Sequence, residues 1–189
     1  DTDFLCHGNP APEHLVQCFR DICATEVPDD GVRFDADSIV TSEIKKDAKY
    51  RGTRVAFNAR IRNARVTLQF DVGFGDSVYP DAVVGEYPRL LDSFPCPNIL
   101  VYPRSTVVAE KFEAIVSLGM LNSRVKDYFD IWLLSEEFDF DYPVLAQAIA
   151  GTFQRRGSNL PDGLPIGLTN EFSQDAMKQS QWAAFIRKV

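Results

Sequence analysis

Polar and apolar residues alternate along the range 65–72, with the two-residue period of a strand that has two unlike faces. The apolar residues are Val66, Leu68 and Phe70, and the polar ones are Thr67, Gln69 and Asp71. Successive side chains of a strand point to opposite faces, so this stretch predicts a half-buried strand with a polar working face. Extended segments are also expected over 33–45 and 53–61, and Asn63-Ala64 predicts a tight hairpin connection.

Helical periodicity dominates elsewhere. In the range 13–25 the apolar residues Leu15, Phe19, Ile22 and Cys23 recur at helical spacing. After Pro103 the pattern becomes almost wholly helical, with Ser105 or Thr106 as the expected N-cap of the next helix. The helices expected in this half cover 105–121, 124–136, 143–155 and 173–187.

The order of these elements predicts the fold class. A strand end at 1–5, a helix, antiparallel strands, a short strand at 98–102 and then helices indicate an α+β protein. We expect a mixed, mainly antiparallel sheet flanked by helices, followed by a C-terminal helical bundle. The change near Pro103 predicts a sheet domain over 1–103 and a helical domain over 104–189.

Composition narrows the functional classes. The 189 residues are 45% hydrophobic, which suits a globular core, and no apolar run approaches the length of a membrane span. The net charge of −7 argues against a protein whose whole surface binds nucleic acid, although it is compatible with a local basic groove. The plain interpretation of the clustered cations is solvated charge; they are Lys45, Lys46, Lys49, Arg51, Arg54, Arg60, Arg62, Arg65, Arg155 and Arg156. Irregularly spaced cysteines suit free thiols in a reducing cytoplasm.

Three carboxylates are candidates for a metal site. Asp1 and Asp3 share one face of a strand, and Asp71 lies on the polar face of another. If the two strands are neighbours, the three carboxylates converge and suit two Mg²⁺ ions ~3.5–4 Å apart, as in phosphoryl transfer. The alternative for Asp1 and Asp3 alone is a solvated strand end.

A second polar group lies in the helical half. Lys111 is flanked by apolar positions and suits contact with a triphosphate, the alternative being a surface lysine. Asp127 and Asp130 are helical neighbours, and Arg124 lies one turn before Asp127. This face either orients Lys111 or a nucleotide base, or forms an ordinary intrahelical salt bridge.

Four blocks together resemble the AbiEii/AbiGii nucleotidyltransferase-like toxin family. They are Asp1-Thr2-Asp3-Phe4-Leu5, the range 68–76 ending in Gly73-Phe74-Gly75-Asp76, the range 102–114 with Ala109-Glu110-Lys111, and the range 122–134 with Lys126-Asp127 and Asp130. The blocks follow the family's order and span roughly 1–156. The resemblance implies a DNA-polymerase-β-like nucleotidyltransferase fold.

The resemblance also implies roles for individual residues. Asp1 and Asp3 match the family's metal-binding pair, with Asp71 as the third carboxylate. Lys111 matches the lysine of the Ala-Glu-Lys helix, and Asp127 and Asp130 match its Lys-Asp-x-x-Asp element. Catalysis is expected from Asp1, Asp3, Asp71, Lys111 and Asp127, and nucleotide binding from Lys111, Arg124, Asp127 and Asp130.

Family resemblance further implies a setting for this chemistry. Such proteins are similar to bacterial cytoplasmic toxins of type IV toxin–antitoxin and abortive-infection (phage-defence) pairs, and the antitoxin is encoded nearby. Some related toxins transfer nucleotides to the 3′ end of tRNA, and others bind GTP. The expected function is therefore Mg²⁺-dependent transfer of a nucleoside monophosphate from an NTP to an acceptor, with tRNA or another RNA as the candidate.

Two alternatives remain open, and one expected element is not in this sequence. The alternatives are a nucleotide-fold protein with little turnover that acts through an antitoxin, and a metal-dependent nuclease. The family's Gly-Ser or Gly-Gly loop, which holds the triphosphate, is expected upstream of Asp1, where this sequence begins.

Overall fold

The computed structural model describes residues 2–47, 50–89 and 91–188, with the backbone alone over 45–47 and 50–51. It divides into two compact units, Asp1–Asp76 and Ser77–Val189. The elements are mixed α and β, which confirms the predicted α+β class. The predicted division near Pro103 stays a prediction.

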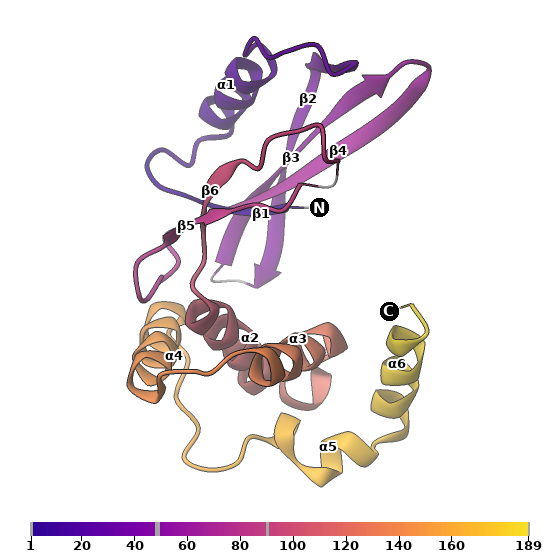
Figure 1. The fold of residues 1–189 in the computed structure, drawn as a ribbon. Coiled ribbons are helices and arrows are strands. Elements are labelled where there is room, and N and C mark those ends of the chain that lie inside the picture. The colour runs from indigo at the N-terminus through magenta and orange to yellow at the C-terminus, as the bar shows by residue number, and fades with distance from the viewer. Residues whose placement is uncertain (1, 48–49, 90, 189) are drawn as a thin grey trace. The chain divides into compact units, whose positions relative to one another are not determined.

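The first unit is a four-stranded sheet with one helix on it (Figure 1). The strand order is β1-β4-β3-β2; β1 runs parallel to β4, and the other pairs are antiparallel. The sheet is therefore mixed, as the sequence predicted. Its elements are β1 (Thr2–Cys6), α1 (Pro12–Cys23), β2 (Val32–Asp47), β3 (Tyr50–Ile61) and β4 (Ala64–Phe74).

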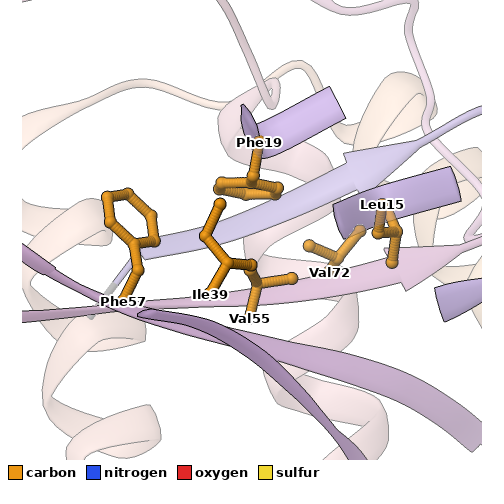
Figure 2. Packing of buried hydrophobic residues seen from close by; sticks show 6 residues of the cluster. All are labelled: Leu15, Phe19, Ile39, Val55, Phe57 and Val72. Carbon is orange, nitrogen blue, oxygen red and sulfur yellow. The ribbon is translucent and has the colours of Figure 1, made fainter. Parts of the chain in front are cut away.

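The core of this unit lies between α1 and one face of the sheet. Leu15 and Phe19 project from the helix onto Ile39, Val55, Phe57 and Val72 of the strands (Figure 2). All six side chains are at most 9% exposed. Helix spacing puts Leu15 and Phe19 on one face of α1, and strand alternation puts the strand residues on one face of the sheet. The opposite face of the sheet is left for polar side chains.

The β3–β4 hairpin turns one residue earlier than the sequence predicted. Its loop is Arg62-Asn63, not Asn63-Ala64, because Ala64 already pairs with Ile61. Arg62 adopts a φ of 53°, the region that two-residue hairpins need and that glycine usually fills. Arg62 therefore lies at the tip of the hairpin in an uncommon backbone conformation.

The second unit contains a small hairpin and the helices. Strand β5, which the sequence did not predict, pairs antiparallel with β6. Phe153, 1% exposed, and Ile115, also 1% exposed, are its largest fully buried apolar side chains among the described residues. Its elements are β5 (Val83–Glu86), β6 (Asn98–Val101), α2 (Arg104–Leu118), η1 (Gly119–Leu121), α3 (Val125–Glu137), α4 (Tyr142–Arg156), η2 (Ile166–Leu168), α5 (Asn170–Gln174) and α6 (Ala176–Ile186).

Two predicted details of the helices are wrong. The N-cap of α2 is Pro103, not Ser105 or Thr106. Thr106 is fully buried instead, where its hydroxyl accepts from Tyr79 N–H and donates to the Tyr79 carbonyl, both at 3.0 Å. The expected helix over 173–187 is divided by Asp175, whose carboxylate accepts from the N–H groups of Met177 and Lys178 and so begins α6.

In the described part of the chain, no helix combines the length and the hydrophobicity that crossing a membrane requires.

Candidate functional site

Two of the predicted metal-binding carboxylates are neighbours in the sheet. Asp3 of β1 and Asp71 of β4 are register partners in the parallel pair. Adjacent strands lie about 4.8 Å apart, and partners of this kind project from the same face. That face is the polar one, opposite α1, because Phe70 and Val72 on either side of Asp71 face the core. The structure thus brings together two acids that are 68 residues apart in sequence.

Arg54 holds Asp71 from the other side. In the antiparallel pair of β3 and β4, Arg54 is the register partner of Asp71. Its Nε and Nη2 atoms donate to the two carboxylate oxygens of Asp71 at 2.8 and 2.9 Å. This is the bidentate geometry that makes arginine–carboxylate pairs specific. The Asp71 side chain is 14% exposed and that of Arg54 40%.

The charges of this group are coupled. The hydrogen bonds to Asp71 raise the pKa of Arg54 above its usual value, partial burial opposes them, and the charges of Asp71 and Asp3 add to the rise. Two carboxylates side by side repel each other unless a cation lies near them. In this structure the guanidinium of Arg54 is that cation.

The donor set fits a hard divalent cation only in part. Carboxylate oxygens are the ligands that Mg²⁺ prefers, and Asp3 and Asp71 offer them on one face. Among the described residues, no group of three or more His, Cys, Asp or Glu side chains could hold a metal. Asp1, the third predicted ligand, lies outside the described residues. Two carboxylates of the described site therefore fit the ion, and Arg54 contacts one of them.

The predicted polar group of the second unit is an ion network between α2 and α3. Lys111 of α2 donates from Nζ to Asp127 Oδ1 at 3.2 Å and to Asp130 Oδ2 at 2.7 Å. Asp127 is only 3% exposed, and its other ion pair is with Arg124 Nε, 2.6 Å from Oδ2. The one-turn spacing of Arg124, Asp127 and Asp130 places all three toward one side of α3. The network holds two positive and two negative charges.

This arrangement leaves donors free for a ligand. An ammonium group has three N–H donors, and two of those on Lys111 point to Asp127 and Asp130. The Lys111 side chain is 19% exposed and that of Arg124 51%, whereas that of Asp127 is 4%. The two cations can thus meet a ligand at the surface, while the buried carboxylate holds them in place.

A neighbouring network in the same unit was not predicted from the sequence. Glu113 of α2, 5% exposed, accepts from Ser117, Ser158 and Arg156. Burial by itself would raise the pKa of Glu113, but the hydrogen bonds and the Arg156 charge outweigh it and lower that pKa. Glu113 holds together α2, the end of α4 at Arg156 and Ser158 just beyond it. Ser117 is a local partner, one helical turn away, but Arg156 and Ser158 lie more than 40 residues away, so the local sequence does not mark the network.

The comparison with protein families decides the classification. A family model described as "Nucleotidyl transferase AbiEii toxin, Type IV TA system" matches residues 1–189. The chain belongs to this family. No curated protein and no solved structure matches the chain.

Membership of the AbiEii family makes the chain a nucleotidyltransferase-like toxin of the type IV toxin–antitoxin class. A nucleotide substrate and an antitoxin partner follow from that class. The family does not assign roles to single residues of this chain. The roles predicted for Asp1, Asp3, Asp71, Lys111, Arg124, Asp127 and Asp130 therefore stay predictions, now attached to observed geometry for all but Asp1.

Sequence reasoning missed the role of Arg54, although a signal for it was present. With a two-residue loop at Arg62-Asn63, Ile61 pairs with Ala64. Seven residues further from the loop on each strand, Arg54 pairs with Asp71. The predicted loop one residue later would have placed Ala56 there instead. The position of the turn, which depends on a positive φ at an arginine, was the missing information.

Proposed function

We propose that the protein transfers a nucleoside monophosphate from an NTP to a hydroxyl of an RNA acceptor, with divalent metal bound at Asp3 and Asp71. The acceptor oxygen bonds to the α-phosphorus, and the bond to the β-phosphate breaks to release pyrophosphate. The observation that carries this proposal is the register pairing of Asp3 with Asp71 on the polar face of the sheet. Nucleotidyltransferase-type toxins need negatively charged oxygens at one point to hold cations against a triphosphate.

The carboxylates have distinct tasks in this proposal. Asp3, which is exposed, binds the cation that accompanies the triphosphate. Asp71, which is more enclosed, lies at the attacking hydroxyl and accepts its proton. When bound, Mg²⁺ supplies positive charge that offsets the charge of the phosphates. Arg54 releases at least one oxygen of Asp71 for this task.

The second unit by itself offers a phosphate contact. Lys111 has a remaining N–H donor for a phosphate oxygen, and Arg124 adds a guanidinium that suits phosphate oxygens. Asp127 and Asp130 are positioning residues, because their hydrogen bonds fix the ammonium of Lys111. tRNA is the candidate acceptor, following the resemblance described above.

The test is incubation of the protein with each labelled NTP, Mg²⁺ and total RNA. We expect labelled, lengthened RNA, and about 10²-fold or greater loss of transfer in Asp3→Asn and Asp71→Asn. The matched control is Asp37→Asn, an exposed aspartate on β2 without a described partner, which should transfer normally. Manganese binding followed by electron paramagnetic resonance should weaken in the first two variants alone.

Other results would contradict the proposal. Label transfer from none of the four NTPs, or full transfer in Asp71→Asn, removes its basis. Shortened RNA in place of lengthened RNA identifies a nuclease instead.

A further inference from the structure

Three arginines form a row across the polar face of the sheet in the first unit. Arg33 of β2 pairs in register with Arg60 of β3, and Arg60 pairs in register with Arg65 of β4. All three side chains are exposed. Neighbouring strands put them about 5 Å apart at the backbone. We call Arg33, Arg60 and Arg65 the arginine row.

The row is unfavourable for the sheet itself. Like charges directly opposite each other destabilise an antiparallel pair. Among the described residues, no carboxylate forms an ion pair with any of the three. Asp35, the next acid on this face of β2, pairs in register with Asn58 and forms no such contact either. The fold therefore keeps three positive charges together without an ion-pair partner among the described side chains.

The hairpin tip adds a fourth positive charge beside the row. Arg62 is exposed and adopts a φ of 53°, where glycine or asparagine would be less strained. An arginine in this conformation, two residues after Arg60, extends the positive surface to the end of the hairpin.

The arginine row and the carboxylates Asp3 and Asp71 lie on the same face. Arg60 is six residues from Arg54, and Arg65 is six residues from Asp71, and even separations return a strand to one face. Six residues span about 20 Å. The paired positions between them are uncharged: Ala56 with Gln69, and Asn58 with Thr67, which are hydrogen-bonded at 3.1 Å.

We infer that the arginine row binds the phosphate backbone of a single-stranded RNA acceptor whose 3′ end lies at Asp3 and Asp71. This inference rests on the proposed function, since it names where the acceptor binds. A guanidinium matches the oxygens of a phosphate, and a row of three suits a ligand with regularly repeated charge. At 3.4 Å per stacked nucleotide, 20 Å corresponds to about six nucleotides.

The overall charge of the protein means that RNA binding depends on a local positive patch such as the arginine row. With a net charge of −7, the protein as a whole repels RNA, so binding requires a surface where positive charge is concentrated. The uncharged stretch of β3 and β4 between the row and the carboxylates lets an RNA strand lie along these two strands, with Asp35 of β2 to one side. An acidic protein would also match the row, but it would not need the row and the acids to lie on one face of the sheet.

The first test measures RNA binding without NTP or metal. The variant is Arg33→Gln/Arg60→Gln/Arg65→Gln, and the ligand is a labelled 12-nucleotide RNA followed by fluorescence anisotropy. We expect the Kd to rise at least about tenfold, and the slope of log Kd against log salt to fall by about 2, from three lost contacts at 0.7 each. The control, Arg20→Gln/Arg187→Gln/Lys188→Gln, removes the same charge elsewhere and should bind nearly as the parent does.

A second test uses acceptor length. In transfer assays the row variant should raise the KM for a 12-nucleotide acceptor and leave the KM for a 3-nucleotide acceptor unchanged, because the short strand ends before the row. An equal rise for both lengths would overturn the inference. The parent protein could show no nucleotide transfer while the row variant still loses RNA binding. That result would contradict the proposed function but keep the arginine row as an RNA-binding surface.

Folding and the rival partner are checked in the same variants. The row variant should melt no lower than the parent, because it loses a repulsion. Unchanged RNA affinity and salt slope would overturn the inference. Loss of binding to polyglutamate, with RNA binding intact, would assign the row to an acidic protein instead.

Discussion

The contact between Arg54 and Asp71 shows how a single residue can govern a candidate metal site. Both oxygens of Asp71 accept from the guanidinium, so a metal ion and Arg54 compete for the same atoms. Arg54 keeps the neighbouring carboxylates compatible before a cation arrives, because it offsets their repulsion. The contact between Arg54 and Asp71 therefore weakens the binding of a metal ion at Asp71.

Arg54→Gln should therefore tighten binding of divalent metal. We expect the Kd for Mn²⁺ to fall by about two- to fivefold, the range that loss of a partly exposed ion pair allows. Electron paramagnetic resonance of free Mn²⁺ measures it, with Arg20→Gln as the control for lost charge. Weaker binding in Arg54→Gln would show that the guanidinium helps to hold the metal site together.

Glu113 illustrates a buried charge whose purpose is structural. Ser117, Ser158 and Arg156 surround its carboxylate, and their hydrogen bonds lower its pKa despite burial. A lowered pKa means that the ionised form stabilises the folded state. That contribution is present above the unfolded pKa, about 4.3, and is lost as the pH falls through the lower folded value.

Glu113→Gln should lower the free energy of unfolding at pH 7 by about 1–3 kcal/mol, because a charge-assisted network becomes a neutral one. The difference from the parent should shrink as the pH falls below about 4.3, where the parent also loses the charge. Urea denaturation between pH 3 and pH 7 measures it, with exposed Glu137→Gln as the control. A difference that grows on acidification would contradict this assignment.

At the scale of elements, the tightest described glycine contact joins η2 to α2 and α3. A methyl group on Gly167 would lie 2.8 Å from both Ile115 Cγ2 and Tyr128 Oη, and 3.3 Å from the Ile115 carbonyl. Ile115 is 1% exposed and Tyr128 is partly buried. A carbon atom at that distance requires displacement of the segment 166–168.

Gly167→Ala should consequently destabilise the second unit by about 1–3 kcal/mol. Gly163→Ala is the matched control, because nothing lies within 4 Å of its added methyl group and its φ is not positive. That variant should be neutral or slightly stabilising, since alanine restricts the unfolded chain. Denaturant unfolding of both variants measures this difference in stability. Equal unfolding midpoints would mean that η2 can move away from α2 without loss of stability.

The strands and helices themselves were largely predictable. The alternation in 65–72 belongs to β4, and the helical spacing of Leu15 and Phe19 belongs to α1. The misses occurred where local pattern is weak. Strand β5 has only four residues, and two of them, Val83 and Val84, are hydrophobic. The N-cap of α2 is a proline, whose side chain makes no capping hydrogen bond. The break at Asp175 needed recognition of an N-cap inside an otherwise helical stretch.

At the scale of the whole molecule, the two units each have a core of their own. Both tryptophans, Trp132 and Trp182, lie in the second unit, so their emission reports the unfolding of that unit. Phe153 is the largest fully buried side chain described there and packs against Phe112 at 5.8 Å between ring centroids.

Phe153→Ala should reduce the free energy of unfolding read from tryptophan emission by about 3–5 kcal/mol, because it leaves a cavity. Tyr142→Ala, at a side chain 81% exposed, should change it by less than about 0.5 kcal/mol. Similar effects of the two substitutions would show that Phe153 is not part of the core that the tryptophans report.

The sequence alone was enough to predict the α+β class, the polar face of β4, the pairing of Arg124 with Asp127 and the likeness to AbiEii toxins. The structural features in this list depend on the spacing of side chains along one helix or strand, or on residues within one helical turn of each other. The order of neighbouring residues in the sequence specifies both. Only the tertiary structure decided which residues from distant segments meet. Asp3 beside Asp71, Arg54 on both oxygens of Asp71, and Arg33, Arg60 and Arg65 in one row all follow from strand order and register. In the β3–β4 hairpin the register depends on where the turn falls, and a shift of one residue there changes every partner in that pair of strands.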